Sequence, residues 1–302
     1  MTGPAEQSLE EMHRVYFKEV LESVRQVMAR HYGLSEVSIR PIGTGGSRLS
    51  IPTRITGTDR NGQRVRYFGK ILGSSDLTVA ASIQFFKNIY LRMNAQDPIF
   101  EFSRSAEEMA RHQYEMLESI HKLGVPTARP HGYHRIDGGL WLLVAEYLEA
   151  EPMSASGQVT PEQLGAVFIY MKRMHRHNLF HGDIKPENLM VGKKLYILDV
   201  GHFREGVRNS RKRAYDLACL ICSLLECAPP DKVAALARRH YPRRDLAAAA
   251  AYLDLVQRRP DINFTDETKE RLRRLLNGQR LLAGTAFLLD LLGLVPAAPP
   301  HA

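Results

Sequence analysis

The chain has 302 residues, and its 41 lysines and arginines against 33 aspartates and glutamates give a formal net charge of +8. A domain usually has about 100–200 residues, so the length fits one large domain or two lobes, and 44% hydrophobic residues can fill a sizeable core. This composition excludes collagen-like, disordered and disulfide-scaffold proteins. The positive charge is compatible with nucleic acid, an acidic membrane surface or a phosphate-bearing substrate, and it selects none of them.

The chain shows no pattern typical of export. Its first residues, MTGPAEQSLEEMH, are acidic where a signal peptide would have a basic and then an apolar stretch. The three cysteines, an odd number, suggest no disulfide framework and favour a reducing compartment. We therefore expect a cytoplasmic protein.

The first part of the chain predicts one helix followed by strands. Residues 1–34 are expected to form an amphipathic helix, because apolar residues recur at helical spacing from Leu9 to Met28 and Gly33 follows as a stop. Residues 37–72 carry β-branched and aromatic residues around the turn sequences GTGGS and DRNG. This pattern predicts three antiparallel strands.

The remaining chain divides at a change of composition. A helical stripe precedes residue 126 and is formed by Met109, Met116, Leu117, Ile120 and Leu123. Residues 139–148 predict one buried strand, and residues 149–158 have the composition of a linker. From Thr160 the pattern is mainly helical, apart from the strand-like pieces NLMV and KLYILDV. We expect a strand-rich lobe (35–148), a helix-rich lobe (149–297) and a disordered tail (298–302).

The most informative segment is HGDIKPENLMV, which continues after a two-residue turn as KLYILDVG. It resembles the catalytic and metal-binding loops of the protein-kinase superfamily, whose template is H-R-D-x-x-x-x-N followed by D-F-G. His181, Asp183 and Asn188 fall in register, and the tripeptide D-V-G that begins at Asp199 stands where D-F-G would. The alternative, an ordinary helix-to-strand turn, is disfavoured because four chemically meaningful residues are in register.

The resemblance implies an α+β, kinase-like fold with two lobes, a small antiparallel β-sheet lobe and a larger helical lobe, with ATP and Mg²⁺ between them. Asp183 would be the catalytic base, because a carboxylate in a polar loop can accept the proton of an attacking hydroxyl. Lys185 would offset charge on the phosphoryl oxygens. Asn188 and Asp199 would supply the oxygen ligands that magnesium prefers. The expected reaction is transfer of the γ-phosphoryl group of ATP to an acceptor hydroxyl.

Two features would contact the phosphates of ATP. Lys70, on the third predicted strand, is placed like the strand lysine of kinases that pairs with the α- and β-phosphates. The turn between the first two strands could lend its backbone N–H groups, and it contains Gly43, Gly45, Gly46 and Ser47. Arg48 stands where G-x-G-x-x-G would have its third glycine, so by itself the turn is equally typical of a plain hairpin.

Two further positions concern the nucleotide pocket. The stretch LLVAEYL resembles the hinge between kinase lobes, in which backbone groups of Glu146 and Leu148 would bind the adenine edge. An ordinary core strand is the alternative. Kinases also place a Glu on a helix to hold the strand lysine, and helical spacing puts Gln113 there instead. Gln113 can accept a hydrogen bond from Lys70 but supplies no charge, and Glu115 is expected to face solvent.

The helix RAYDLACLICSLL follows the motif. By the same resemblance, Asp216 would tie this helix to the backbone of the catalytic loop. Cys219 and Cys222 have C-x-x-C spacing, but they lie in an apolar helix with no second pair nearby. Buried core thiols are therefore favoured over a zinc site.

The sequence leaves the acceptor open. Lys185 is typical of serine/threonine protein kinases, which favours a protein hydroxyl. Asp199 and Asp216 are only 17 positions apart (216 − 199), with no A-P-E between them. This resembles the compact RIO-type, aminoglycoside and lipopolysaccharide-sugar kinases and favours a small-molecule, sugar or lipid acceptor. A nucleotide-binding regulatory pseudokinase is the third alternative, because Gln113 carries no charge.

The expected partners are ATP and a hydroxyl-bearing acceptor. The sequence has no clear nucleic-acid motif. The apolar stretch 281–295 is interrupted by Asp290 and is shorter than the roughly 20 residues that span a bilayer. We expect a terminal helix that closes the helical lobe, with an interfacial membrane helix as the alternative.

Overall fold

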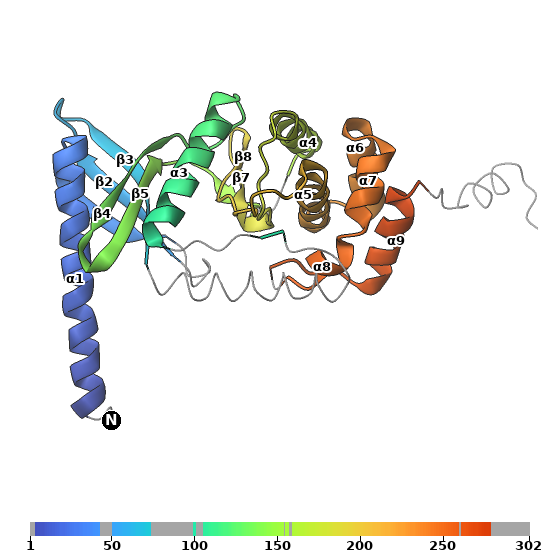
Figure 1. Cartoon of the computed structure of the whole chain (residues 1–302). Coiled ribbons are helices and arrows are strands. Elements are labelled where there is room, and N and C mark those ends of the chain that lie inside the picture. The colour runs from blue at the N-terminus through green and yellow to red at the C-terminus, as the bar shows by residue number, and fades with distance from the viewer. Residues whose placement is uncertain are drawn as a thin grey trace, which may run out of the picture.

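The computed structural model describes residues 4–42, 50–73, 99–100, 105–153, 155–156, 159–259 and 261–278, with side chains from Lys18 onward. Its elements divide into a sheet part, with five antiparallel strands, α1 and α3, and a helical part that holds α4 to α9 (Figure 1). The α+β class with one antiparallel sheet region and one helical region is therefore confirmed. The predicted boundaries at residues 34, 148 and 297 stay predictions.

α1 (Pro4–Tyr32) packs the second half of its length against the sheet (Figure 1). Apolar residues three or four positions apart share one face of a helix. Those that are buried against the sheet are Val20, Val24, Val27 and Met28. The helix ends where Gly33 adopts a φ of +66°, a backbone conformation that favours glycine. The predicted helix and its stop are confirmed.

The larger sheet has the strand order β1-β2-β3-β5-β4, with every neighbouring pair antiparallel. Its strands are β1 (Ser35–Pro41), β2 (Ile51–Thr58), β3 (Arg64–Leu72), β4 (Pro130–Ile136) and β5 (Leu140–Glu146). The three strands predicted over residues 37–72 and the strand predicted over 139–148 are confirmed. β5 is buried over most of its length, as its continuous apolar run indicates.

β4 is the strand of this sheet that the sequence did not predict. Its residues, PHGYHRI, include a proline, a glycine and two histidines and do not alternate between apolar and polar. The strand forms by pairing with β5, where Tyr133 faces Leu143 and Arg135 faces Trp141. Pairing with the edge of β5 therefore fixes β4 in the strand conformation, which its local sequence does not favour.

α3 (Ala106–Lys122) packs beside β4 and β5 and carries the apolar stripe predicted for this region. It begins at Ser105, whose Oγ accepts a hydrogen bond from the backbone N–H of Glu108. Leu117 and Ile120 are buried, and Met116 packs against the core of the helical part. α3 therefore contacts both parts of the molecule.

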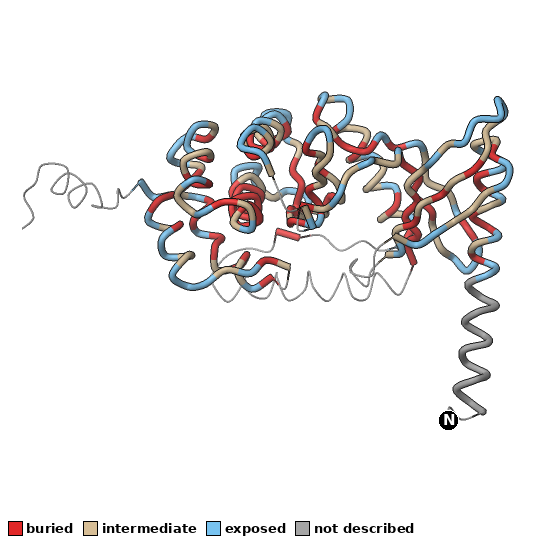
Figure 2. The backbone as a smooth tube through the Cα atoms, turned by 180° about the vertical axis from the view of Figure 1, so that it is seen from behind, coloured by how far each residue is buried: buried red, intermediate tan, exposed pale blue. Residues whose placement is uncertain are grey.

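The helical part is built around α5 (Asn209–Ser223). Every residue from Ala214 to Ser223 is buried, so this helix has apolar neighbours on all sides (Figure 2). The other helices of this part are α4 (Pro161–Arg176), α6 (Pro230–His240), α7 (Arg243–Ala250), α8 (Leu253–Gln257) and α9 (Asp266–Leu276), of which α6, α7 and α8 contact α5. Single-turn 3₁₀ helices occur at Asp137–Gly139, Pro186–Asn188 and Leu224–Glu226.

A small antiparallel sheet lies beside α4 and holds both predicted strand-like pieces. Its strands are β6 (Glu151–Pro152), β7 (Leu189–Val191) and β8 (Leu195–Ile197). Cys219 and Cys222 are buried in α5 and form no disulfide, which confirms the prediction of core thiols. No helix in the described part of the chain is both long and apolar enough to cross a membrane. The segments 281–295 and 298–302 lie outside the described residues.

Ile99 and Phe100 belong to the core of the helical part, although they precede α3 in the chain. Phe100 forms an isolated antiparallel bridge with Phe203, and their rings stack at 5.9 Å between centroids. Its ring also meets that of Tyr215 edge-on, with centroids 5.0 Å apart. Ile99 and Phe100 therefore pack in the helical part, although they lie in the chain between β3, a strand of the larger sheet, and α3, which packs beside that sheet.

We expect Phe100→Ala to lower the free energy of unfolding by about 3–5 kcal/mol, because it empties a site among aromatic rings. Phe100 is only 3% exposed. Denaturant unfolding followed by circular dichroism measures the change. Ile169→Ala is the control, since Ile169 is 47% exposed and its truncation should change the free energy by about 0.5 kcal/mol at most. Equal effects of the two substitutions would contradict the assignment of Phe100 to the core.

Candidate active site

The loop that contains the sequence motif is fixed by Asp216 of α5. The Asp216 side chain is fully buried, and its two oxygens accept the backbone N–H groups of His181, at 2.6 Å, and Gly182, at 2.7 Å. Hydrogen bonds to a buried carboxylate are among the stronger ones in proteins. Asp216 thus ties α5 to the backbone of the loop, which confirms the role expected for it.

His181 connects this loop to the residue that precedes Asp199. Its Nε2 lies 2.8 Å from the carbonyl oxygen of Leu198, which can only accept, so Nε2 carries the proton. Its Nδ1 accepts the backbone N–H of Asp183. Complete burial lowers the pKa of His181, and the nearby carboxylates oppose that shift less strongly. The ring is therefore neutral and holds one defined tautomer.

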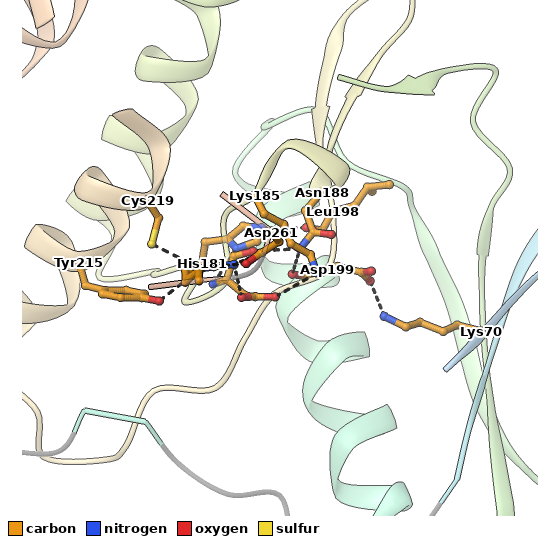
Figure 3. A network of polar contacts seen from close by, with 11 residues as sticks. Lys70, His181, Lys185, Asn188, Leu198, Asp199, Tyr215, Cys219 and Asp261 are labelled. Atoms are coloured by element: carbon orange, nitrogen blue, oxygen red, sulfur yellow. Dashed lines mark hydrogen bonds and ion pairs between the residues drawn. The ribbon is translucent and has the colours of Figure 1, made fainter. Parts of the chain in front are cut away.

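Figure 3 shows Asn188 beside Asp199, and the hydrogen bonds of Asn188 bring Asp183 to the same place. The Asn188 side-chain Nδ2 donates to the backbone carbonyl of Asp183, at 2.9 Å, and to that of Asp199, at 3.2 Å. Asn188 is buried, so this bridge has little freedom. The two loops that the motif predicted to be adjacent are linked by the predicted amide.

Gly201 allows the two loops to approach each other. Its backbone N–H donates to the carbonyl of His181 at 2.7 Å. A Cβ atom at this position would lie 3.0 Å from the carbonyl carbon of Gly182 and 3.1 Å from the Cβ of Asp183. Only glycine fits there without displacing the backbone of the loop. Asp199 itself has a φ of +55°, in the left-handed region that a non-glycine residue rarely adopts.

Lys70 reaches this site from the larger sheet (Figure 3). It lies in β3, as predicted, and its Nζ donates to Asp199 Oδ1 at 2.7 Å. The Lys70 side chain is 9% exposed, whereas that of Asp199 is 43% exposed. The ion pair therefore links the sheet part to the helical part and places an amine beside the candidate metal ligand.

The carboxylate of Asp183 has cations on both oxygens. Asp183 Oδ1 accepts a hydrogen bond from Arg259 Nη2 at 2.8 Å, and Oδ2 lies 3.9 Å from Lys185 Nζ. Lys185 was predicted for this place. Arg259 was missed, because it is 76 positions away and the sequence around it, QRRPD, matches no motif that we recognised.

Gln113 does not contact Lys70 in the structure. Its Oε1 is buried and has no hydrogen-bond partner among the described residues, while Lys70 donates to Asp199 instead. The neighbouring His112 contacts the D-V-G tripeptide, since its Nε2 lies 3.0 Å from the Gly201 carbonyl oxygen. The rings of His112 and His202 stack at 4.1 Å between centroids. α3 therefore meets the site through a histidine that the sequence analysis did not single out.

The predicted hinge residues, Glu146 and Leu148, lie at and just after the end of β5. The backbone N–H of Glu146 donates to the Arg129 carbonyl at 2.8 Å, so this donor already has a partner. The Glu146 side chain is exposed, and Leu148, two residues beyond it, is half-buried. Their contact with adenine stays a prediction. Gly43, Gly45, Gly46 and Ser47 lie outside the described residues.

The oxygen donors of the site are few. Within the described ranges no group of three or more histidine, cysteine, aspartate or glutamate side chains is arranged to hold a metal ion. Asp199 and the amide of Asn188 are the predicted ligands. Two oxygen ligands suit Mg²⁺, which prefers oxygen and usually keeps several of its water ligands. The site thus holds the carboxylate of Asp199 paired with the Lys70 amine, and the amide of Asn188, which joins Asp199 to Asp183.

No family model matches the sequence, and no curated protein matches it significantly. Among the solved structures that are similar in fold are two of the kinase domain of Mycobacterium tuberculosis PknI. A mutant form has 12% identity and a TM-score of 0.43, and its match covers 80% of this chain and 96% of that domain. The second structure has 13% identity and a TM-score of 0.42, with the same coverage.

We expect the wild-type chain to lose stability as the pH falls below about 6.5, partly because of His181. Its pKa is lowered in the folded state, so the unfolded chain binds a proton that the folded chain excludes. His181→Gln should be less stable than the wild type near neutral pH, and the difference should narrow in acid. Denaturant unfolding at a series of pH values measures this difference. His177→Gln, which alters an exposed residue, is the control. A difference in unfolding free energy between His181→Gln and the wild type that stays constant with pH would contradict the role of His181.

Proposed function

We propose that this chain is a phosphotransferase that moves the γ-phosphoryl group of ATP to an acceptor hydroxyl. The observation that supports it most is the ion pair between Lys70 and Asp199, whose backbone is joined to that of Asp183 through the side-chain amide of Asn188. An amine from the sheet thus faces an acid and an amide from the helical part. Kinase-type phosphoryl transfer uses this combination of groups.

In the proposed reaction, the acceptor oxygen attacks the γ-phosphorus while its proton passes to the carboxylate of Asp183. The bond between the γ-phosphorus and the bridging oxygen breaks, and ADP leaves. Lys185 offsets the negative charge on the transferring phosphoryl oxygens, and Lys70 pairs with the phosphates that remain on ADP. Asp183 acts as the base because its side chain is partly exposed beside Lys185.

Magnesium fits the residues that are present. Asn188 uses its Nδ2 for two backbone carbonyls, so its Oδ1 is the side-chain atom left as a ligand. Asp199 gives one oxygen to Lys70 and is exposed enough to offer the other. A bound Mg²⁺ would neutralise phosphate charge in this site. Asn188 and Asp199 are the residues proposed to hold it.

The acceptor class rests on two features that favour different answers. Lys185, which lies 3.9 Å from Asp183, supports a serine or threonine hydroxyl of a protein as the first candidate. A small-molecule, sugar or lipid hydroxyl is the second candidate, because the chain between Asp199 and the start of α5 at Asn209 is short. A segment of this length offers little surface for docking a polypeptide.

A regulatory nucleotide-binding module is the third candidate. Gln113 brings no acidic group to Lys70, and its Oε1 has no partner among the residues described. On that alternative the chain would bind nucleotide with little transfer. The ion pair that orients Lys70 comes from Asp199 instead, which favours transfer over this alternative.

We expect Asp183→Asn to lower the rate of phosphoryl transfer by about 10²- to 10⁴-fold, because the amide cannot accept the proton. Nucleotide binding should be retained. Incubation with γ-labelled ATP and Mg²⁺ measures the transfer, and a fluorescent nucleotide measures the binding. Asp231→Asn on α6 is the control, since it removes an exposed ion pair with Arg271 of α9 and should leave both readouts unchanged. Undiminished transfer by Asp183→Asn would refute the assigned base.

The same assay separates the three candidates by where the label appears. Label on added protein supports the first candidate, and label in a soluble or lipid fraction supports the second. Nucleotide binding without transfer or hydrolysis supports the third and refutes the phosphotransferase proposal.

We expect Lys70→Met to lower transfer by about 10²- to 10³-fold, because it removes a cation from the phosphates and from Asp199. Nucleotide affinity should also fall. The labelled-ATP assay and nucleotide titration measure both changes. Lys122→Met is the matched control at an exposed ion pair on α3. A Lys70→Met variant with the activity and affinity of the Lys122→Met control would remove Lys70 from the site.

A further inference from the structure

A buried arginine from the C-terminal half of the helical part contacts the candidate base. Arg259 lies between α8 and α9 and is 5% exposed. Its Nη2 donates to Asp183 Oδ1 at 2.8 Å. Figure 3 shows Tyr215, Cys219 and Asp261 grouped with the catalytic loop in this region.

The remaining donors of Arg259 are also engaged. Nε and Nη2 donate to the two carboxylate oxygens of Asp261, at 3.1 and 2.5 Å, in a bidentate pair. Nη1 lies 3.3 Å from the hydroxyl oxygen of Tyr215 and 3.5 Å from Cys219 Sγ. A bidentate carboxylate fixes the plane of a guanidinium group. Asp261 and the two α5 side chains therefore orient Arg259, and Arg259 in turn holds one oxygen of Asp183.

Stability alone does not explain this arrangement. Burying a guanidinium and its carboxylate partners costs about as much solvation free energy as the ion pairs return, and apolar replacements are often as stable. The carboxylate that Arg259 reaches is also only part-buried and belongs to the polar loop rather than to the core. The cluster is therefore better explained by an effect on Asp183 than by the folding of α5.

We propose that Arg259 is a positioning residue for phosphoryl transfer, which fixes the carboxylate of Asp183 in the orientation that receives the acceptor hydroxyl. With Oδ1 held by Arg259, rotation of the carboxylate is restricted, and Oδ2 lies on the side of Lys185, 3.9 Å from its Nζ. Asp261 balances the charge of Arg259. The carboxylates of Asp183 and Asp261 and the cations of Arg259 and Lys185 therefore sum to a formal charge of zero. This inference rests on the proposed function.

Orientation is the property of the base that matters most in this reaction. Phosphoryl transfer passes through a loose transition state in which catalysis is mainly positioning and charge stabilisation. A misplacement of about 1 Å can reduce the rate about 100-fold. A base held by a rigid guanidinium group thus has an advantage over one that is free to rotate.

The test compares Arg259→Met with the wild type in the labelled-ATP assay. We expect kcat to fall about 10- to 100-fold, while KM for ATP and the affinity for a fluorescent nucleotide stay within about twofold, since Arg259 contacts the base and not Lys70. Arg259→Lys should recover only part of kcat, because a lysine keeps the charge but not the planar fork. Arg258→Met, at the exposed neighbouring arginine, is the matched control and should keep the wild-type kcat.

Two measurements keep the inference testable if Arg259→Met folds poorly. Asp261→Asn retains an acceptor for Arg259 but loosens the bidentate pair, so kcat should fall severalfold with KM for ATP unchanged. Methylguanidinium at a non-denaturing concentration should restore turnover to Arg259→Ala, whereas N-methylurea, which has a similar shape and no charge, should not. Equal effects of both additives would show that the site needs only to be filled.

The outcomes separate this inference from the proposed function. A wild-type chain that transfers phosphate, with Arg259→Met at the wild-type kcat, overturns the role of Arg259 and leaves the phosphotransferase intact. A fall in kcat that merely follows a fall in nucleotide binding or in folded fraction also overturns it, as does equal rescue by the two additives. A wild-type chain with no transfer to any acceptor overturns the proposed function and the role of Arg259 with it.

Discussion

The carboxylate of Asp216 on α5 is buried in the helical part, where an unpaired charge would be strongly destabilising. It is satisfied by the backbone N–H groups of His181 and Gly182, and the ring of His175 lies 3.3 Å away. Because these donors belong to the loop that carries Asp183, the need to satisfy one buried charge fixes the position of that loop. The helical core thus acts directly on the geometry of the site.

Three further contacts involve the segment from Asp199 to Phe203, which is hydrogen-bonded to this loop. Lys70 of β3 pairs with Asp199, His112 of α3 meets the carbonyl of Gly201, and Phe100 packs between Phe203 and Tyr215. The first contact is electrostatic and exposed on one side, whereas the third is apolar and buried. The two polar contacts join the sheet part to this segment, and that of Lys70 places its amine beside Asp199, whereas the apolar contact belongs to the core of the helical part.

The predictions that succeeded were those carried by short-range patterns. The helix that ends before Gly33, the strands of residues 37–72 and the strand that carries Lys70 follow from local periodicity and turn residues. Asp183 and Asn188 also lie close together in the structure, as their spacing in the sequence predicted, because a short polar loop leaves few conformations for them. The failures were β4, which depends on the edge of β5, and the partner of Lys70, which is Asp199 rather than Gln113.

The sequence by itself determined which residues we propose for the chemistry and roughly where they fall, since the ability to accept a proton, bind a metal ion or pair with phosphate is a property of residue types at fixed spacing. Only the tertiary structure decided what surrounds them. Arg259 lies 76 positions from Asp183 and carries no local signal. Its contact with Asp183 exists because the packing of α5, α8 and α9 brings two distant loops to one place, and the periodicity of a sequence holds no information on contacts at that range.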